Sequence, residues 1–224
     1  MYIDETCGFC AEIHSIPSDN NLLLHHITPN TGLTSRVITQ TEHFVVIPTL
    51  GSFVEGYVMV LSKAHYDCAG QIPADQMAEL TQLLEMLKNR IRQCYHTDTV
   101  CFEHGSVSCT NRFGGCINHA HIHIVPCPNS LMGEIALYDL QTEKIDSLED
   151  LQDYGQRGEP YLYFEDTDQQ KYLITGDNVV SQFFRKLLAQ QHGVDEKWDW
   201  RTDLCMENVQ KTCQRLSEEF AYGT

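Results

Sequence analysis

The chain has 224 residues, of which 42% are hydrophobic, and a formal net charge of −16 at pH 7. This is enough material for one large domain or a domain with an extension, and the negative charge argues against nonspecific nucleic-acid binding, which needs clustered Lys and Arg. The first twenty residues lack a basic start followed by an apolar core, and no apolar run reaches membrane-spanning length. We therefore expect a cytoplasmic protein that contacts neither nucleic acid nor membranes.

Two cysteines near the start of the sequence, Cys7 and Cys10, are separated by two residues. This spacing lets two thiolates bind one tetrahedral zinc ion. Thioredoxin-like redox pairs share the spacing but follow the first strand of a βαβ pattern, and no such pattern precedes this pair. We favour a metal site, keep a redox pair as the alternative, and expect the other eight of the ten cysteines to be reduced thiols.

The next part of the chain predicts short strands and one long helix. Apolar residues from Met77 to Ile91 recur at three- and four-residue spacing after Pro73, which predicts a helix that reaches about residue 93. β-favouring runs predict strands at 22–26, 35–41, 43–48, 56–61 and 99–103, the second and third forming a hairpin. Antiparallel strands with one long helix predict an α+β domain.

Three histidines, His119, His121 and His123, alternate with apolar residues in a run that ends at Pro126. Alternation predicts a β-strand with all three imidazoles on one face, roughly 7 Å apart along the strand. One ring can then act on a substrate while the others bind or orient it. A solvent face that carries histidine by chance, or a metal cluster, explains strict alternation of three of the eleven histidines less well.

Beyond about residue 131 acidic side chains outnumber basic ones. The patterns predict a short helix at 147–154, a hairpin of strands 161–165 and 171–175, and helices at 181–191 and 206–220. We divide the chain into a catalytic domain, 1–131, that begins with a zinc knuckle, and an acidic extension, 132–224, that packs on it.

The run from His119 to Val125 resembles the signature of the histidine triad (HIT) family of nucleotide hydrolases and transferases. That signature is three histidines alternating with apolar residues and followed by two apolar positions, and the resemblance covers about residues 5–130. It implies a HIT-like antiparallel sheet, a half-barrel, with one long helix, to which a mixed α/β extension is added. Small members pair two chains, so the resemblance allows a homodimer or an extension that takes the partner's place.

The resemblance also implies a mechanism. The middle histidine, His121, would attack the α-phosphate of a nucleotide derivative and form a nucleotidyl-histidine, because a neutral imidazole is a good nucleophile near pH 7. Its other ring nitrogen would donate to a backbone carbonyl of the same strand. His123 would donate to phosphate oxygens or to the leaving group.

In zinc-bearing members of the family, a histidine after the third strand and the first histidine of the triad complete the cysteine pair. The matching positions are His65 and His119. The resemblance therefore implies one structural zinc ion held by Cys7, Cys10, His65 and His119.

Substrate contacts are where the sequence departs from the family pattern. Gly115 stands where a phosphate-contacting Gln is familiar, Cys116 where Ser or Thr is, and Thr49 where a ribose-contacting Asn is. Gly114 and Gly115 can still let the backbone approach a phosphate closely. We expect Thr49, Glu103, Gly115 and Cys116 to contact the substrate.

Two pairs of side chains in the extension are interpreted more conservatively. Arg185 and Arg201 could reach a bound phosphate but are predicted to form surface salt bridges. Trp198 and Trp200 are predicted to be packing anchors.

The predicted function is that of a nucleotide hydrolase or nucleotidyltransferase. Its substrate would be a dinucleoside polyphosphate, a nucleoside phosphoramidate or a related conjugate cleaved at the α-phosphate. A non-catalytic nucleotide-binding or scaffold protein of the same fold, and a metal-binding or redox protein, remain the alternatives. The base, the leaving group and the acceptor stay open.

Overall fold

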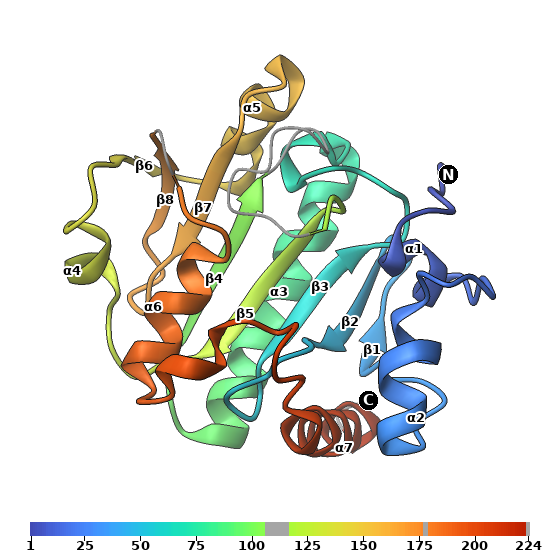
Figure 1. Ribbon diagram of the computed structural model, residues 1–224. Coiled ribbons are helices and arrows are strands. Elements are labelled where there is room, and N and C mark those ends of the chain that lie inside the picture. Colours follow the sequence, from blue (N-terminus) through green and yellow to red (C-terminus); the bar gives the residue numbers. More distant parts are fainter. Residues whose placement is uncertain (106–116, 177–178, 223–224) are drawn as a thin grey trace.

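A single antiparallel sheet of eight strands forms the centre of the computed structural model, which describes residues 1–105, 117–176 and 179–222. The strand order is β1-β2-β3-β5-β4-β7-β8-β6 (Figure 1). The strands are β1 (Thr39–Gln40), β2 (Phe44–Pro48), β3 (Val58–Ser62), β4 (Thr99–Gly105), β5 (His121–Pro126), β6 (Gln141–Ile145), β7 (Tyr161–Glu165) and β8 (Lys171–Thr175). The predicted α+β class with an antiparallel sheet is confirmed.

Helices pack on both faces and at one end of this sheet (Figure 1). The α-helices are α1 (Gly8–Ile13), α2 (Thr28–Thr31), α3 (Ala74–Tyr95), α4 (Met132–Ile135), α5 (Gln152–Arg157), α6 (Phe183–Gln191) and α7 (Met206–Tyr222). Short turns of other helix types are η1 (Leu23–Ile27, a π-helix) and the 3₁₀ turns η2 (Ala69–Gln71), η3 (Leu148–Leu151) and η4 (Asp195–Trp198).

Strand β5 lies in the interior of the sheet, between β3 and β4. His123 is opposite Met59 on β3 and opposite Phe102 on β4, and His121 is opposite Leu61. Because side chains alternate along a strand, residues 121 and 123 share one face, whereas Ile122 and Ile124 belong to the core cluster that packs against α3. The histidines therefore project from a strand that is hydrogen-bonded along both edges.

The long helix α3 covers the sheet face opposite the histidines. Its buried stripe includes Met77, Leu80, Leu84, Leu87 and Ile91, at the spacing that the sequence predicts, and Pro73 is its N-cap. This burial fixes which face of β5 is apolar.

The C-terminal part of the chain continues the same sheet. β7 pairs with β4 in an antiparallel ladder from Cys101 opposite Glu165 to Gly105 opposite Tyr161, and β8 and β6 follow. Helix α6 packs on the histidine face with Phe183, Phe184 and other apolar side chains. The division into 1–131 and 132–224 stays a prediction, but residues on both sides of it share one sheet and one core.

One sequence prediction about an element was wrong, and one strand was missed. The predicted strand at 22–26 is the π-helix η1, because the Asn21 side chain holds a turn there: its amide donates to the carbonyls of Ala11 and Ile16, and its oxygen accepts from the Leu24 N–H. β6 was missed, because four of its five residues are exposed and polar and the strand depends on pairing with β8. Within the described residues no helix has the length and apolar character needed to span a membrane.

Candidate functional site

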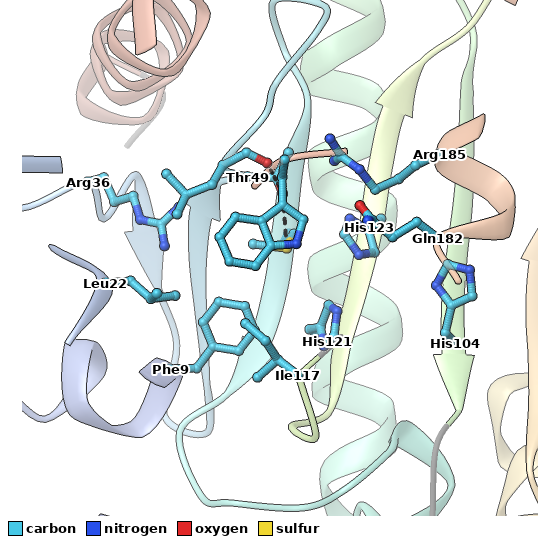
Figure 2. Close-up of a pocket in the computed structure, with 13 residues that line it drawn as sticks. Phe9, Leu22, Arg36, Thr49, His104, Ile117, His121, His123, Gln182 and Arg185 are labelled. Carbon is cyan, nitrogen blue, oxygen red and sulfur yellow. Dashed lines mark hydrogen bonds between the residues drawn. The ribbon is translucent and has the colours of Figure 1, made fainter. Parts of the chain in front are cut away.

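A cavity of ≈ 530 Å³, including its open side, lies on the histidine face of the sheet. Figure 2 shows His121 and His123 on one wall and Phe9, Leu22 and Arg36 on the opposite wall. Three parts of the chain line it: the N-terminal segment with Phe9, Leu22 and Arg36, the sheet and its loops with Thr49, Leu50, Met59, His104, Ile117, His121 and His123, and the C-terminal part with Gln182, Arg185 and Trp200.

His121 presents a bare ring nitrogen to this cavity. Its Nδ1 lies 2.5 Å from the carbonyl oxygen of His119, so Nδ1–H donates to that acceptor and Nε2 keeps its lone pair. Burial lowers the pKa of His121 to about 4, which keeps the ring neutral near pH 7. Phe9 packs edge-on against it at 5.4 Å between centroids and limits its rotation.

His123 is oriented by a short chain of hydrogen bonds. Nη1 of Arg185 lies 3.3 Å from the Tyr57 hydroxyl oxygen, which lies 3.0 Å from Nδ1 of His123. The arginine can only donate, so the hydroxyl accepts from it. Among the described residues Nδ1 of His123 is the acceptor within reach of the hydroxyl proton, and with the proton donated there the neutral imidazole carries its own proton on Nε2. Burial holds the pKa of His123 well below its usual value, and Phe102 stacks on the ring at 4.4 Å.

A third histidine, His104, lines the same cavity as His121 and His123 and was not predicted. It follows Phe102 by two residues on β4, so it shares the face of the triad, and it is 8% exposed. Burial lowers its pKa to about 3. Among the described residues its Nε2 has no hydrogen-bond partner. The alternation of β4 and its pairing with β5 were the signals that could have identified it.

Glu103 was predicted to contact the substrate, and the structure places it outside the cavity. Its side chain is on the other face of β4, where Oε1 accepts from the Ala69 N–H at 2.7 Å and Oε2 from the Tyr161 hydroxyl at 2.7 Å. Burial raises its pKa to about 7, although these donors and the His121 backbone N–H oppose the shift. Glu103 therefore supports β5 from beneath and does not line the cavity.

The remaining predicted contacts fall in two groups. Thr49 lines the cavity, with its hydroxyl 3.3 Å from the Leu50 carbonyl oxygen. Gly115 and Cys116 lie outside the described residues.

The two arginines of the extension differ from each other. Arg201 forms the predicted surface ion pair, 2.8 Å from Asp199. Arg185 does not: it is 3% exposed, lines the cavity, and has no carboxylate partner in the described part of the chain. The prediction failed because α6 folds over the histidine face and carries Arg185 into the interior. Trp200 also lines the cavity. Trp198 instead packs on the buried core cluster that contains Phe183 and Phe184 of α6.

The four predicted metal ligands come together at one end of the triad. Their candidate ligand atoms all lie within 4.8 Å of one another. Nδ1 of His119 is 3.5 Å from Sγ of Cys7, and Nδ1 of His65 is 3.4 Å from Sγ of Cys10. Tetrahedral zinc with usual bond lengths places sulfur and nitrogen ligands about 3.5 Å apart, so the donor set and its spacing fit that ion.

Outer contacts orient these ligands. Nε2 of His119 lies 2.8 Å from the carbonyl oxygen of Ser62, so it donates there and leaves Nδ1 as the ligand atom. Nε2 of His65 lies near the carboxylates of Asp4 and Asp67, at 3.9 and 3.8 Å. The hydrogen bond between the two thiols lowers the pKa of Cys10 and raises that of Cys7, so Cys10 is the thiol that ionises first. The cluster can hold a divalent metal ion.

Comparison with known proteins agrees with the triad. Residues 30–129 match the family model of the HIT domain. Matching solved structures include a hypothetical histidine triad nucleotide-binding protein from Sulfolobus tokodaii strain 7 (21% identity, 54% of this chain and 68% of that chain, TM-score 0.38). A HIT family member from Bacillus subtilis (16% identity, 56% and 75%, TM-score 0.41) and a zinc-bound histidine triad family protein from Mycobacterium smegmatis (18% identity, 68% and 92%, TM-score 0.40) also match. No curated protein matches the chain.

Proposed function

We propose that the protein, of which residues 30–129 match the family model of the HIT domain, is a nucleotide hydrolase or nucleotidyltransferase that acts through a covalent nucleotidyl-histidine at His121. The substrate would be a nucleotide conjugate cleaved at its α-phosphate. The observation that carries the proposal is the state of His121: a neutral, buried ring with Nδ1 engaged and Nε2 bare, on the wall of a cavity.

The chemistry would proceed in two displacements. In the first, Nε2 of His121 forms a bond to the α-phosphorus as the bond between phosphorus and the leaving-group oxygen breaks. The Nε2–H of His123 is available to donate to that oxygen or to a phosphate oxygen, and the charge of Arg185 lies nearby. In the second, water or another acceptor attacks phosphorus and releases the imidazole. Each well-placed donor typically contributes about 3 kcal/mol to such a transition state.

The opposite wall of the cavity supports a nucleotide as ligand. Phe9, Leu22 and Ile117 supply apolar surface suited to an aromatic base, while the histidine wall supplies the polar groups for phosphate. Thr49 stands between them and is a candidate ribose contact. The proposal includes a cytoplasmic location for the protein and allows it to form a homodimer.

We further propose that the ion held by Cys7, Cys10, His65 and His119 is zinc and that its role is structural. The four protein ligands would fill all four positions of a tetrahedral zinc ion, so no coordination position would remain for a substrate. When bound, zinc would tie the N-terminal segment, including Phe9 of the cavity wall, to His119, two residues before β5. The residues that act on phosphate are separate from this cluster.

Trapping the adduct tests the proposal. The protein is mixed with a panel of adenine and guanine dinucleoside polyphosphates, phosphoramidates and nucleotide sugars, quenched, and examined by intact mass spectrometry and peptide mapping. We expect a nucleotidyl mass on His121 and a loss of turnover of about 10³-fold or more in His121→Asn. His25→Asn, a change at an exposed histidine, is the matched control. Nucleotide binding without any adduct or turnover would instead support the non-catalytic alternative.

A further inference from the structure

One wall of the cavity contains polar atoms that the chemistry at His121 leaves unused. Nε2 of His104 and Oε1 of Gln182 are both buried without a hydrogen-bond partner among the described residues. The two side chains are 8% and 3% exposed, and both line the cavity. Buried polar atoms cost free energy unless a partner satisfies them, so two such atoms in one cavity indicate a ligand group that would pair with them.

The orientation of the Gln182 amide is fixed. Its Nε2 donates to the Asp199 carboxylate at 3.1 Å, which directs the oxygen elsewhere. Gln182 has φ +58°, in the left-handed region, and is the N-cap of α6. Strain of this kind persists where surrounding structure maintains it, often in ligand sites. Oε1 of Gln182 is therefore a fixed hydrogen-bond acceptor on the wall of the cavity.

Arg185 adds a fixed positive charge to the same wall. Its guanidinium donates to the carbonyl oxygens of Gly51 and Trp198 at 2.7 and 2.8 Å and to the Tyr57 hydroxyl, all uncharged acceptors. Gly51 has φ +67°, and a Cβ there would lie 2.7 Å from Nη2, so the arginine is closely enclosed. Its charge is free to be balanced by an anion of the ligand.

The three residues lie together beyond the nucleophile. Figure 2 shows His104, Gln182 and Arg185 on the side of the cavity away from Phe9 and Leu22. The His104 and His123 rings both contact Phe102, at 5.5 and 4.4 Å between centroids, and Arg185 donates to the Tyr57 hydroxyl that bonds to His123. If the base occupies the apolar wall, the group expelled from phosphorus lies on this polar wall.

We propose that His104, Gln182 and Arg185 form a leaving-group subsite that selects a hydroxyl-bearing phosphate ester, such as a sugar phosphate, over an alkylamine. This inference rests on the proposed function and deepens it. The phosphate matches Arg185, and a sugar hydroxyl can donate to Gln182 Oε1 and pair with His104 Nε2. An alkylammonium group would meet the charge of Arg185 without a carboxylate beside it.

A matched set of substrates that share the same base tests the subsite. The comparison is made once with adenine and once with uracil as the base. The set is a nucleoside diphosphate hexose, the corresponding ethyl ester of the nucleoside diphosphate, which lacks the hydroxyls, and an N-alkyl phosphoramidate. We expect kcat/KM for adduct formation to be about tenfold higher for the hexose than for the ethyl ester, and lower still for the phosphoramidate.

The variants are Gln182→Met and His104→Phe, which keep side-chain size but remove the polar atoms. In each variant we expect kcat/KM to fall about tenfold for the hexose and to change little for the ethyl ester. The control Gln190→Ala, at an exposed position of α6, should change kcat/KM for neither substrate. Thermal unfolding and metal content of each variant verify folding. Equal rates for the hexose and the ethyl ester in wild type, or equal losses on both in the variants, would overturn the subsite.

Calorimetric binding of glucose 1-phosphate separates this inference from the proposed function. We expect Gln182→Met to raise its Kd about tenfold while the Kd of inorganic phosphate is unchanged. If no adduct forms with any substrate, the proposed function fails, and this binding comparison still decides the subsite. Equal affinity of both proteins for the hexose phosphate would refute it.

Discussion

The reactivity of this site depends on the protonation state of individual rings. His121 and His123 are neutral because they are buried, and each has its proton fixed by one neighbour: the His119 carbonyl for His121 and the Tyr57 hydroxyl for His123. The sequence predicted the first of these contacts through the family resemblance. The second needs Tyr57 and Arg185, which are 128 positions apart in sequence and meet only in the folded chain.

Replacing Tyr57 with phenylalanine tests this orientation. Without the hydroxyl, His123 can adopt the other tautomer, so we expect kcat for adduct formation to fall about tenfold with KM little changed. Tyr163→Phe is the control, because that buried hydroxyl bonds to Glu165 at 2.9 Å, on the face that packs against α3. Both variants should lose about 1 kcal/mol of stability, and only the first should lose activity. Equal kinetics of the two variants would contradict the role of Tyr57.

Glu103 predicts a pH dependence of stability. Burial raises its pKa from 4.5 to about 7, so the folded state binds its proton more tightly than the unfolded state does. The stabilisation is complete below pH 4.5 and is lost as the pH rises through 7. In urea unfolding, wild type should therefore lose more stability than Glu103→Gln between pH 5 and pH 8, by about 2 kcal/mol. Parallel pH profiles of the two proteins would show that the carboxyl is ionised throughout.

At the scale of elements, the metal cluster joins α1 to the start of β5. Cys10 lies in α1, and His119 lies two residues before β5. The sequence spacing predicted the cysteine pair, the family resemblance implied His65 and His119, and the structure brings these four side chains together. Phe9 of α1, which lines the cavity, lies between the two candidate cysteine ligands in sequence.

Removal of the metal should loosen the N-terminal segment. We expect about one zinc per chain by elemental analysis, and Cys10→Ser should abolish it and lower the Tm by about 10 °C. Cys213→Ser, at a half-buried cysteine of α7, is the control and should retain zinc. Finding no zinc in wild type purified without chelator, or unchanged zinc content in Cys10→Ser, would refute the assignment.

At the scale of the whole molecule, the sheet does not stop where the composition changes. β7 completes the hydrogen bonds of β4, and α6 delivers Gln182 and Arg185 to the cavity. The sheet is continuous from β1, near the N-terminal segment, to β6 in the C-terminal part. The core cluster that packs against α3 also contains residues from both parts of the chain. A continuous sheet of this kind is expected to unfold cooperatively.

Two probes at opposite ends of the chain can measure that cooperativity. Trp198 and Trp200 are the chain's only tryptophans, so fluorescence reports the C-terminal part, whereas release of zinc to a chromogenic indicator reports the N-terminal cluster. We expect both to follow one urea transition with the same midpoint. A fluorescence change that precedes zinc release would show that residues 132–224 unfold as a separate unit.

Local chemistry and periodicity determined much of this protein from the sequence alone. The alternation of His119, His121 and His123, the stripe of α3 and the hairpin of β7 and β8 each depend on residues close in sequence, and they predicted the histidine strand, the long helix and the hairpin. The family resemblance, and not a local pattern, implied the two histidines of the candidate metal site. Only the tertiary structure decided which face of β4 meets the cavity, and that α6 buries Arg185 and Gln182 beside the triad. The physical reason is that these outcomes depend on strand pairing and helix packing between distant residues, whose contacts no local pattern encodes.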